Sequence, residues 1–392
     1  MSLATKPETT AAEDLAAVRQ RVRDVLDEHV TPERLTRHDE EETYDLDLYR
    51  ALAKAGLIQL EAELDGRRAL HQSQTIVLEE LGARATSIGV SIVVQYMGVE
   101  LLHTFGDSMQ RKRFLAPLFA GDARMSFALS EPDGGTDVAR AMSTHAVAQQ
   151  DGSYLISGRK KWIGGAMDAD FLIVLARTTK IERSAIDGIT MFIVPRDTPG
   201  IRTKPIDTMG IRGLEQCDIE FENVRVPGEL VLGQADKGFR QVLGTLNGER
   251  LNGAAVAFGI ARGALDYAVE YVKERQAFGR PVGAFQGLQH MLVDASVKIE
   301  GARLLLQNAA RMSDEDEGAS ETLSAIAKLA ASDAATTATD VGMRAMGGWG
   351  FLRQLPMQRY FRDARLYTFA PLTDEMIRNY IGEKHLGLPR SY

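Results

Sequence analysis

A carboxylate followed by a basic residue stands in NGERL, residues 247–251, as Glu249 and Arg250. A carboxylate can act as a general base when burial raises its pKa toward neutrality, as the removal of a weakly acidic proton requires. The simpler interpretation places Glu249 at or near the start of a helix, as a solvated acid that the helix dipole favours. The local sequence alone favours the simpler interpretation.

A second acidic group follows a proline in LYTFAPLTDEM, residues 366–376. Thr373 suits a helix start, because its hydroxyl and the carboxylates of Asp374 and Glu375 can satisfy the free amides of a first helical turn. Pro371 fits just outside such a helix. We therefore predict a bend followed by a helix cap.

Two glycine-containing stretches could contact a ligand. FALSEPDGGTDVA, residues 127–139, has a Gly–Gly pair before Thr136 and Asp137. The amides of such a loop could hold an anion, although a simple turn is the commoner outcome. KKWIGG, residues 160–165, places Trp162 at a strand end, where its ring could cover a planar ligand or pack in the core.

The chain lacks the generic motifs of nucleotide-binding loops, zinc proteases and serine hydrolases, namely GxGxxG after a strand, GxxxxGK[ST], HExxH and GxSxG. Its histidines are scattered without the spacing of metal ligands, so no metal site is expected. Cys217 is the only cysteine, which excludes an internal disulfide and a thiolate metal cluster.

Composition favours a globular protein of two or three domains, with 392 residues, 44% hydrophobic and 26% charged. The formal charge of −8 argues against a nucleic-acid partner. The N-terminus lacks the apolar core of a signal peptide, and the longest apolar runs fall short of a membrane span. We expect a soluble, cytoplasmic protein without a membrane partner.

The elements that must position these residues follow the order helices, strands, helices. Helical spacing of apolar residues predicts a helical domain over 15–122, after a flexible N-terminus at 1–14. The acidic stretch 38–45 is interpreted as a solvated connector. Short β-rich runs, with CDIEFENVRV alternating most clearly, predict an antiparallel, barrel-like domain over 123–236.

A C-terminal helical bundle is predicted over 237–392, with helices near 288–312, 320–345 and 355–367. ERQAFGRPVGAFQGLQH, residues 274–290, joins two long helices. By itself this segment is a helical hairpin with a polar elbow. MGGWG breaks the helical pattern further on.

Together these stretches, in this order and at these separations, resemble the acyl-CoA dehydrogenase family from about residue 15 to the end. The similarity rests on MSFALSEPDGGTDVA, the KKW segment, ERQAFGRPVGAFQ, MGGWGF and RDARLYTFAPLTDEM. It implies an α+β fold with an N-terminal helical domain, a central antiparallel β domain and a C-terminal four-helix-type bundle. It also implies FAD, a homotetramer, and oxidation of the Cα–Cβ bond of an acyl thioester with an electron-transferring flavoprotein as acceptor.

The resemblance carries site residues over to this chain. Contacts to FAD within one subunit are implied for Phe127, Leu129, Ser130, Gly135, Thr136, Trp162, Ile163, Gly164, Thr373 and Glu375. Contacts to the FAD of a neighbouring subunit are implied for Arg275, Phe278, Gln286, Arg344, Gly347 and Gly348. Positions on the substrate side are Arg250, Thr136, Ala370 and Pro371. Binding across subunits would explain why no dinucleotide motif is found.

The resemblance also changes the interpretation of Glu249. In many members the base lies in the loop before the final helix, where this chain has Pro371, which cannot abstract a proton. A minority branch, similar to isovaleryl-CoA dehydrogenase and to crotonobetainyl-CoA reductase-like members, carries the base on the long helix at the position of Glu249. Glu249 is therefore the expected catalytic base.

Three departures from the family pattern stand out. Pro371 lacks the N–H that usually donates to the thioester oxygen, and loss of such a donor costs on the order of a hundredfold in rate. Gly164 replaces a hydroxyl residue that bonds near flavin N5. Arg344 and Trp349 replace more typical residues beside MGG.

These departures leave several functions open. The leading one is an FAD-dependent dehydrogenase of acyl-CoA or acyl-carrier-protein thioesters with Glu249 as base. The second is an enoyl-thioester reductase or a flavin-dependent monooxygenase on the same fold. The third is a non-catalytic flavoprotein or helical assembly protein.

Overall fold

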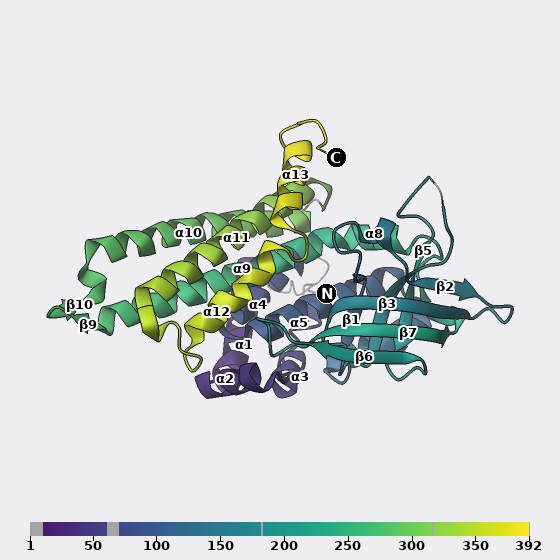
Figure 1. Ribbon diagram of the computed structural model, residues 1–392, viewed down its shortest axis with the longest axis horizontal. Helices are drawn as coiled ribbons and strands as arrows, with labels where there is room; N and C mark the ends of the chain where they lie inside the picture. The colour runs from purple at the N-terminus through teal and green to yellow at the C-terminus, as the bar shows by residue number, and fades with distance from the viewer. Residues whose placement is uncertain (1–10, 61–69, 182, 316, 392) are drawn as a thin grey trace, which may run out of the picture.

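The computed structural model describes residues 11–60, 70–181, 183–315 and 317–391. Helices, a sheet and a second group of helices follow one another along the chain, as predicted (Figure 1). The long C-terminal helices extend away from the sheet, so the molecule has a helical end and a β end.

The N-terminal helices bury apolar faces in one core. In the first helix, Val18, Val22 and Leu26 are buried at the predicted helical spacing. The elements are α1 (Ala11–His29), α2 (Pro32–Glu41), α3 (Leu46–Lys54), α4 (Leu70–Arg84), α5 (Thr86–Phe105), α6 (Ser108–Gln110), the π-helix η2 (Arg111–Leu115) and α7 (Ala116–Ala120).

The acidic stretch 38–45 is not the solvated connector that its charge predicts. Its first half belongs to α2, and Asp39 is buried and accepts a hydrogen bond from Arg362 at 2.6 Å. Asp45 is also buried, caps α3 and pairs with Arg34 at 2.5 Å. The sequence could not predict the burial of Asp39, because its partner Arg362 is distant along the chain and lies near it only in the fold.

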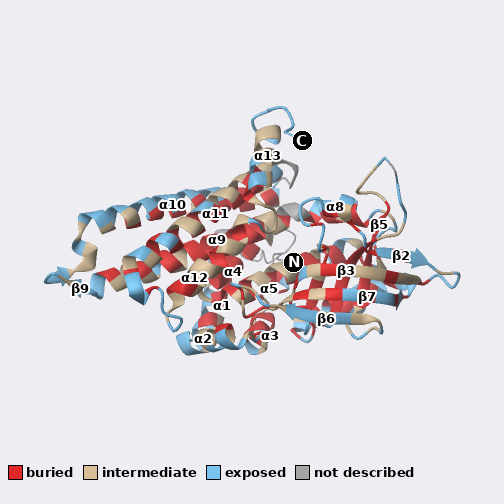
Figure 2. Ribbon diagram, viewed as in Figure 1, coloured by how far each residue is buried: buried red, intermediate tan, exposed pale blue. Residues whose placement is uncertain are grey.

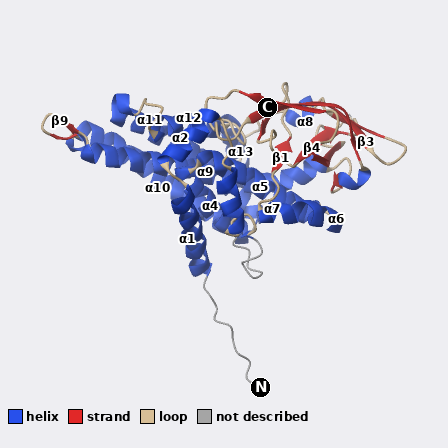
Figure 3. Cartoon of the chain, turned by 90° about the horizontal axis from the view of Figure 1, so that it is seen from below, coloured by secondary structure: helices blue, strands red, loops and turns tan. Residues whose placement is uncertain are grey.

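Helix α5 is long and apolar enough to span a bilayer by length and composition, contrary to the expectation from the sequence. Of its apolar window, 61% is buried inside the fold, as in the core helix of a globular protein. Figure 3 shows α5, α6 and α7 along one side of the sheet.

The sheet is mixed, which corrects the predicted antiparallel domain. Strand β1 pairs with β4 in parallel, and β2 meets β4 in parallel at His145 and Arg177. Alternating burial predicts which face of a strand is buried but not which strand lies beside it. The strands are β1 (Met125–Ala128), β2 (His145–Ala148), β3 (Tyr154–Gly164), β4 (Phe171–Arg177), β5 (Ile189–Pro195), β6 (Ile201–Ile206), β7 (Gln216–Val226) and β8 (Val231–Leu232). The path runs β6-β7-β3-β2-β4-β5-β8, with the short helices α8 (Val138–Ala141) and η3 (Gly228–Leu230) in its connections.

The predicted alternation in β7 is confirmed. Cys217, Ile219 and Phe221 are buried, whereas Glu220 and Glu222 between and after them are exposed. One face of this strand therefore packs in the core of the β part.

The C-terminal helices pack along one another, and buried positions lie where they meet (Figure 2). The predicted second and third helices are confirmed to within a few residues. The elements are α9 (Gly238–Glu274), α10 (Gln286–Glu315), α11 (Glu317–Met346), α12 (Pro356–Ala364) and α13 (Asp374–Lys384). Short segments connect them: β9 (Gln276–Ala277), β10 (Arg280–Pro281), η4 (Val282–Ala284), η5 (Gly347–Trp349) and η6 (Arg365–Thr368).

Two glycines let α4 and α9 cross at backbone contact. A Cβ atom on Gly82 would overlap the carbonyl of Val256, and one on Gly259 would overlap the carbonyl of Glu79. Beside this crossing, Arg262 of α9 pairs with Glu79. The crossing joins the N-terminal helices to the C-terminal bundle and so sets the depth at which α9 lies.

Candidate active site

The loop after β1 lies against the end of β3. Lys161 N–H donates to Ser130 O at 2.9 Å, which ties the loop to the strand. Phe127 and Leu129 are half-buried on either side of the fully buried Ala128. Two of the stretches singled out in the sequence therefore meet at one place.

Trp162 keeps an open ring at this place. The residue is 54% exposed and has φ of 63°, at a register shift between β3 and β7. A left-handed backbone is unfavourable for a large residue, so the surrounding strand must hold it there. Further along the loop that follows β1, Gly135 and Thr136 are exposed, and a Cβ on Gly135 would meet no atom within 4 Å. An uncovered flat ring on β3 and open backbone in the loop bonded to that strand fit the ring and phosphates of FAD.

Two predicted neighbours of Trp162 differ in what they can contact. The side chain of Ile163 is 2% exposed, so only its backbone can reach a cofactor. A Cβ on Gly164 would lie 3.3 Å from Gln216 Nε2, so a hydroxyl residue there would require Gln216 to shift. Ser126, which the sequence did not single out, donates from Oγ to Gly164 O at 2.8 Å. No local pattern marks that serine.

Glu249 lies well inside α9, which begins at Gly238, and not near a helix start. This position rules out the helix-dipole interpretation of its acidity, since that effect is confined to the first turn. Burial raises the pKa of Glu249 to about 7, against a smaller lowering by Arg250. A carboxyl with this pKa exists in both protonation states near neutral pH, as a general acid or base must.

Pro371 packs against α9 one turn after Glu249. A Cβ on Gly253 would lie 3.2 Å from Pro371 Cδ and 3.7 Å from Tyr367 Cε1. Residues 249 and 253 share one side of the helix, because positions four apart lie one above the other. The two positions at which the family resemblance implies a base are therefore neighbours in this fold, and the absence of a side chain at Gly253 leaves room for the proline ring.

The loop that carries Pro371 is held by buried groups of α11. Lys328 Nζ donates to Leu372 O at 2.8 Å and to Asp374 Oδ1 at 2.7 Å. Ser332 Oγ donates to Tyr367 O at 3.0 Å and also bonds Asp374. Sequence reasoning missed Lys328 and Ser332, because nothing in a helical pattern distinguishes a buried lysine from a solvated one.

The predicted cap after this loop is confirmed. Thr373 is the N-cap of α13, and its side chain accepts a hydrogen bond from Met376 N at 3.2 Å. Glu375 is exposed and lies 3.7 Å from Arg378. The hydroxyl of Thr373 keeps its hydrogen as a donor for a cofactor.

Arg250 reaches the same final helix. Its guanidinium lies 5.1 Å from the centre of the Tyr380 ring, and the Tyr380 hydroxyl donates to Glu321 at 2.7 Å. Tyr380 is a further residue that the sequence did not mark. Arg250 follows Glu249 in the sequence, but this contact places its positive charge against α13.

The remaining predicted positions lie at the other end of the bundle. Figures 1 and 3 both show the β9–β10 hairpin at the end of α9 that points away from the sheet. Phe278 at its tip is 95% exposed with φ of 52°. The structure does not bring this group to Trp162 within one chain. It comprises Arg275, Phe278, Gln286, Arg344, Gly347 and Gly348.

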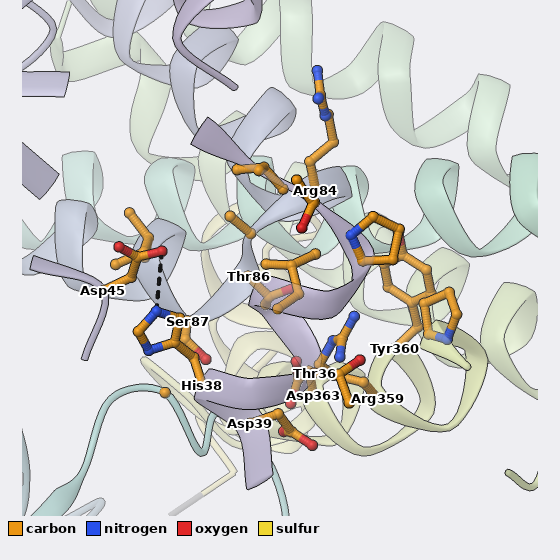
Figure 4. Close-up of a pocket in the computed structure, with 18 of the residues that line it drawn as sticks. Thr36, His38, Asp39, Asp45, Arg84, Thr86, Ser87, Arg359, Tyr360 and Asp363 are labelled. Atoms are coloured by element: carbon orange, nitrogen blue, oxygen red, sulfur yellow. Dashed lines mark ion pairs between the residues drawn. The ribbon is translucent and has the colours of Figure 1, made fainter. Parts of the chain in front are cut away.

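A cavity of about 320 Å³ lies elsewhere, between α2, the α4–α5 junction and α12 (Figure 4). None of the predicted site residues lines it. Asp363 lies at its wall, 1% exposed, and accepts a hydrogen bond from Ile211 N at 2.7 Å. The pKa of Asp363 is raised to about 6, chiefly by burial; the hydrogen bond from Ile211, Arg362 and Arg359 act to lower this pKa, and Asp39 acts to raise it.

Asp363→Asn is expected to stabilise the protein progressively as the pH rises from about 4 to about 6. The folded carboxyl binds its proton more tightly than an unfolded aspartate, so the wild type loses stability over this window, by roughly 3 kcal/mol in total. The amide cannot ionise and still offers an oxygen to Ile211. Denaturant unfolding of both proteins from about pH 4 to about pH 7 measures the difference, and a pH-independent difference would contradict this reasoning.

The chain matches three consecutive family patterns. Residues 12–122 match the acyl-CoA dehydrogenase N-terminal domain, 126–224 the middle domain and 236–386 the C-terminal domain. A probable acyl-CoA dehydrogenase of Bacillus subtilis is 36% identical over 94% of this chain and 97% of its own length.

Solved structures agree over the whole fold. The butyryl-CoA dehydrogenase of Megasphaera elsdenii superposes with a TM-score of 0.88 at 32% identity, covering 97% of this chain and 100% of that one. A glutaryl-CoA dehydrogenase of Mycobacterium smegmatis in complex with FADH2 has a TM-score of 0.88 at 26% identity, covering 97% of this chain and 96% of that one.

Proposed function

Because the chain belongs to the acyl-CoA dehydrogenase family, we propose that it oxidises the Cα–Cβ bond of an acyl thioester with Glu249 as the base. Members of this family are oxidoreductases that act on CH–CH groups, and FAD is the cofactor of this chain. One observation carries the choice of base: Glu249 has a pKa raised to about 7 by burial and lies one turn of α9 from the contact with Pro371.

The chain's own residues supply the proton transfer. A thioester α-proton is only weakly acidic, so its removal requires a positioned base of sufficient strength. Burial strengthens Glu249 as a base while leaving a large part of it ionised near neutral pH. Bound FAD supplies the acceptor for the β-hydride. Phe127, Leu129, Ser130 and Trp162 are the residues proposed to hold its ring system, with Thr373 at the final loop.

Donors for the thioester oxygen are scarce in the loop around Pro371. Pro371 has no N–H, and Ala370 N–H donates to Leu366 O at 2.9 Å. This shortage favours a second candidate on the same fold, a flavin-dependent monooxygenase, because a hydroxylation does not require the charge of a thioester enolate to be stabilised. An enoyl-thioester reductase, the other alternative on this fold, forms the same enolate when hydride adds to Cβ, so the shortage of donors does not distinguish it from a dehydrogenase.

We propose acyl-CoA or acyl-carrier-protein thioesters as substrates and an electron-transferring flavoprotein as acceptor, as the family resemblance implies. A homotetramer is also proposed. It would cover the apolar face of α10, where Val293, Val297 and Leu304 are 57%, 66% and 58% exposed. It would also bring the β9–β10 hairpin of one subunit to the cofactor of another. A sedimentation mass equal to that of one chain would contradict this assembly.

Anaerobic mixing with a panel of acyl thioesters is expected to bleach the visible absorbance of the bound flavin. Straight-chain, branched and dicarboxylic acyl groups on CoA and on a carrier protein separate the substrate classes. If no thioester bleaches the flavin, but NAD(P)H and oxygen support turnover in the presence of a flavin reductase, the monooxygenase candidate replaces the dehydrogenase. Bleaching by NAD(P)H followed by reoxidation with an enoyl thioester would favour the reductase.

A further inference from the structure

A buried ion pair lies directly behind the loop that follows β1. Lys160 on β3 is 0% exposed, and its Nζ lies 2.9 Å from Glu131 Oε1. Removing two charges from water is costly, and the loss is offset only when every remaining hydrogen-bonding position is used. The other hydrogen-bond partners of Lys160 and Glu131 must therefore help to offset the cost of burying this pair.

Both carboxylate oxygens of Glu131 accept hydrogen bonds from residues other than Lys160. Its carboxylate accepts hydrogen bonds from Ser143 N at 2.7 Å, Ser143 Oγ at 2.7 Å and Thr144 N at 3.0 Å. Burial acts to raise the pKa of Glu131, but Lys160 and these donors outweigh it and lower the pKa to about 2. The carboxylate is thus charged at neutral pH and does not depend on Lys160 for most of its hydrogen bonds.

Lys160 also has a hydrogen-bond partner outside the ion pair. Its Nζ also donates to Leu129 O at 2.9 Å. The next carbonyl of the loop, Ser130 O, accepts the hydrogen bond from Lys161 N–H. Two consecutive loop carbonyls are therefore held by two consecutive residues of β3, immediately before Trp162.

We propose that Lys160 is a positioning residue for FAD, which fixes the backbone at Leu129 and Ser130 relative to Trp162 before the cofactor binds. The inference rests on the proposed assignment of this loop and of Trp162 to the flavin site. A fixed loop lowers the ordering cost of binding, because less conformational freedom is lost when the ligand arrives. An apolar side chain at position 160 would leave Leu129 O without its buried donor.

A set of variants in the full-length holoprotein separates this role from a purely stabilising one. Lys160→Met removes both bonds of the ammonium, Glu131→Gln removes the opposite charge, and the double variant leaves no unpaired buried charge. Lys204→Met, an exposed lysine on β6 of the same sheet, is the matched control. FAD dissociation constants come from the fluorescence of released flavin on serial dilution, and stability comes from denaturant unfolding.

Lys160→Met is expected to weaken FAD binding at least about tenfold and to lower stability. The double variant should be more stable than Lys160→Met, because no unpaired charge is buried, but keep FAD binding at least about tenfold weaker, because Leu129 O still lacks its donor. Glu131→Gln and Lys204→Met should stay within about threefold of the wild-type dissociation constant.

Wild-type FAD affinity in the double variant would overturn the inference, since the ion pair would then act on stability alone. If Lys160→Met does not fold, the double variant carries this test. A wild type that no thioester bleaches, but whose FAD affinity still falls in the double variant, would count against the proposed reaction and support the role of Lys160.

Discussion

Glu249→Gln is expected to abolish the bleaching of the flavin by acyl thioesters while leaving FAD bound. Glutamine has nearly the same size and no basic oxygen, so the substrate site is kept and the proton acceptor is lost. General-base catalysis contributes roughly 10²–10⁴-fold, and the rate of flavin reduction should fall by this amount. Stopped-flow absorbance with excess thioester measures the rate, and the visible spectrum of the resting protein shows that FAD is retained.

The pH dependence of the wild type gives an independent check on the same residue. Since the pKa of Glu249 is raised to about 7 and the ionised form is the base, the rate of flavin reduction should rise with pH through about 7 and then level off. Glu270→Gln, at an exposed carboxylate on the same helix, serves as the matched control and should leave the rate unchanged. Full activity of Glu249→Gln would sink the assignment of the base.

Gly259→Ala is expected to be the most destabilising single-methyl change in the bundle. The added carbon would overlap Glu79 O and approach Ala83 N and Gly82 Cα to 2.9 Å, and all three are backbone atoms of α4. A flexible side chain could turn away, but a helix backbone has to move as a unit. Overpacking costs about 1–3 kcal/mol and more where relaxation is blocked, so we expect a loss of about 3 kcal/mol or more in unfolding free energy.

Gly244→Ala provides the comparison on the same helix. Gly244 is exposed, and a Cβ there would meet no atom within 4 Å. Alanine has the higher helix propensity, so this change should stabilise the protein by roughly 0.5–1 kcal/mol. Denaturant unfolding of both variants measures the two effects. If Gly259→Ala has the same unfolding free energy as Gly244→Ala, the fold does not depend on the close contact between α4 and α9.

Local patterns predicted those elements that depend on local physics. The cap at Thr373, the alternation in β7 and the helices of the bundle follow from hydrogen bonding and burial over a few residues. The mixed sheet and the buried Asp39 could not be predicted, because each depends on a partner far along the chain. Secondary-structure propensity depends on residues that are close in the sequence, whereas the pairing of strands and of buried charges depends on which segments meet in the fold.

The residues of the candidate site likewise differ in how far they could be predicted from the sequence. Glu249 could be selected from the sequence only through the resemblance, because its local pattern is that of an ordinary helical acid. Its raised pKa depends on how deeply α9 is buried, which the crossing at Gly259 helps to set. Lys160 and Lys328 look like solvated lysines in the sequence, and their partners at Leu129 O and Leu372 O are backbone atoms that no side-chain pattern reveals.

The contact between Pro371 and Gly253 has a consequence for how such a site could change over time. A carboxylate introduced at position 371 would lie near Glu249, and two like charges at one site compete for a single proton, which raises the pKa of one of them strongly. A glutamate there would also need the space that the proline ring now occupies beside Gly253. Two carboxylates at this place would thus titrate as a coupled pair, so gaining a base at position 371 before losing Glu249 would change the pKa of the existing base.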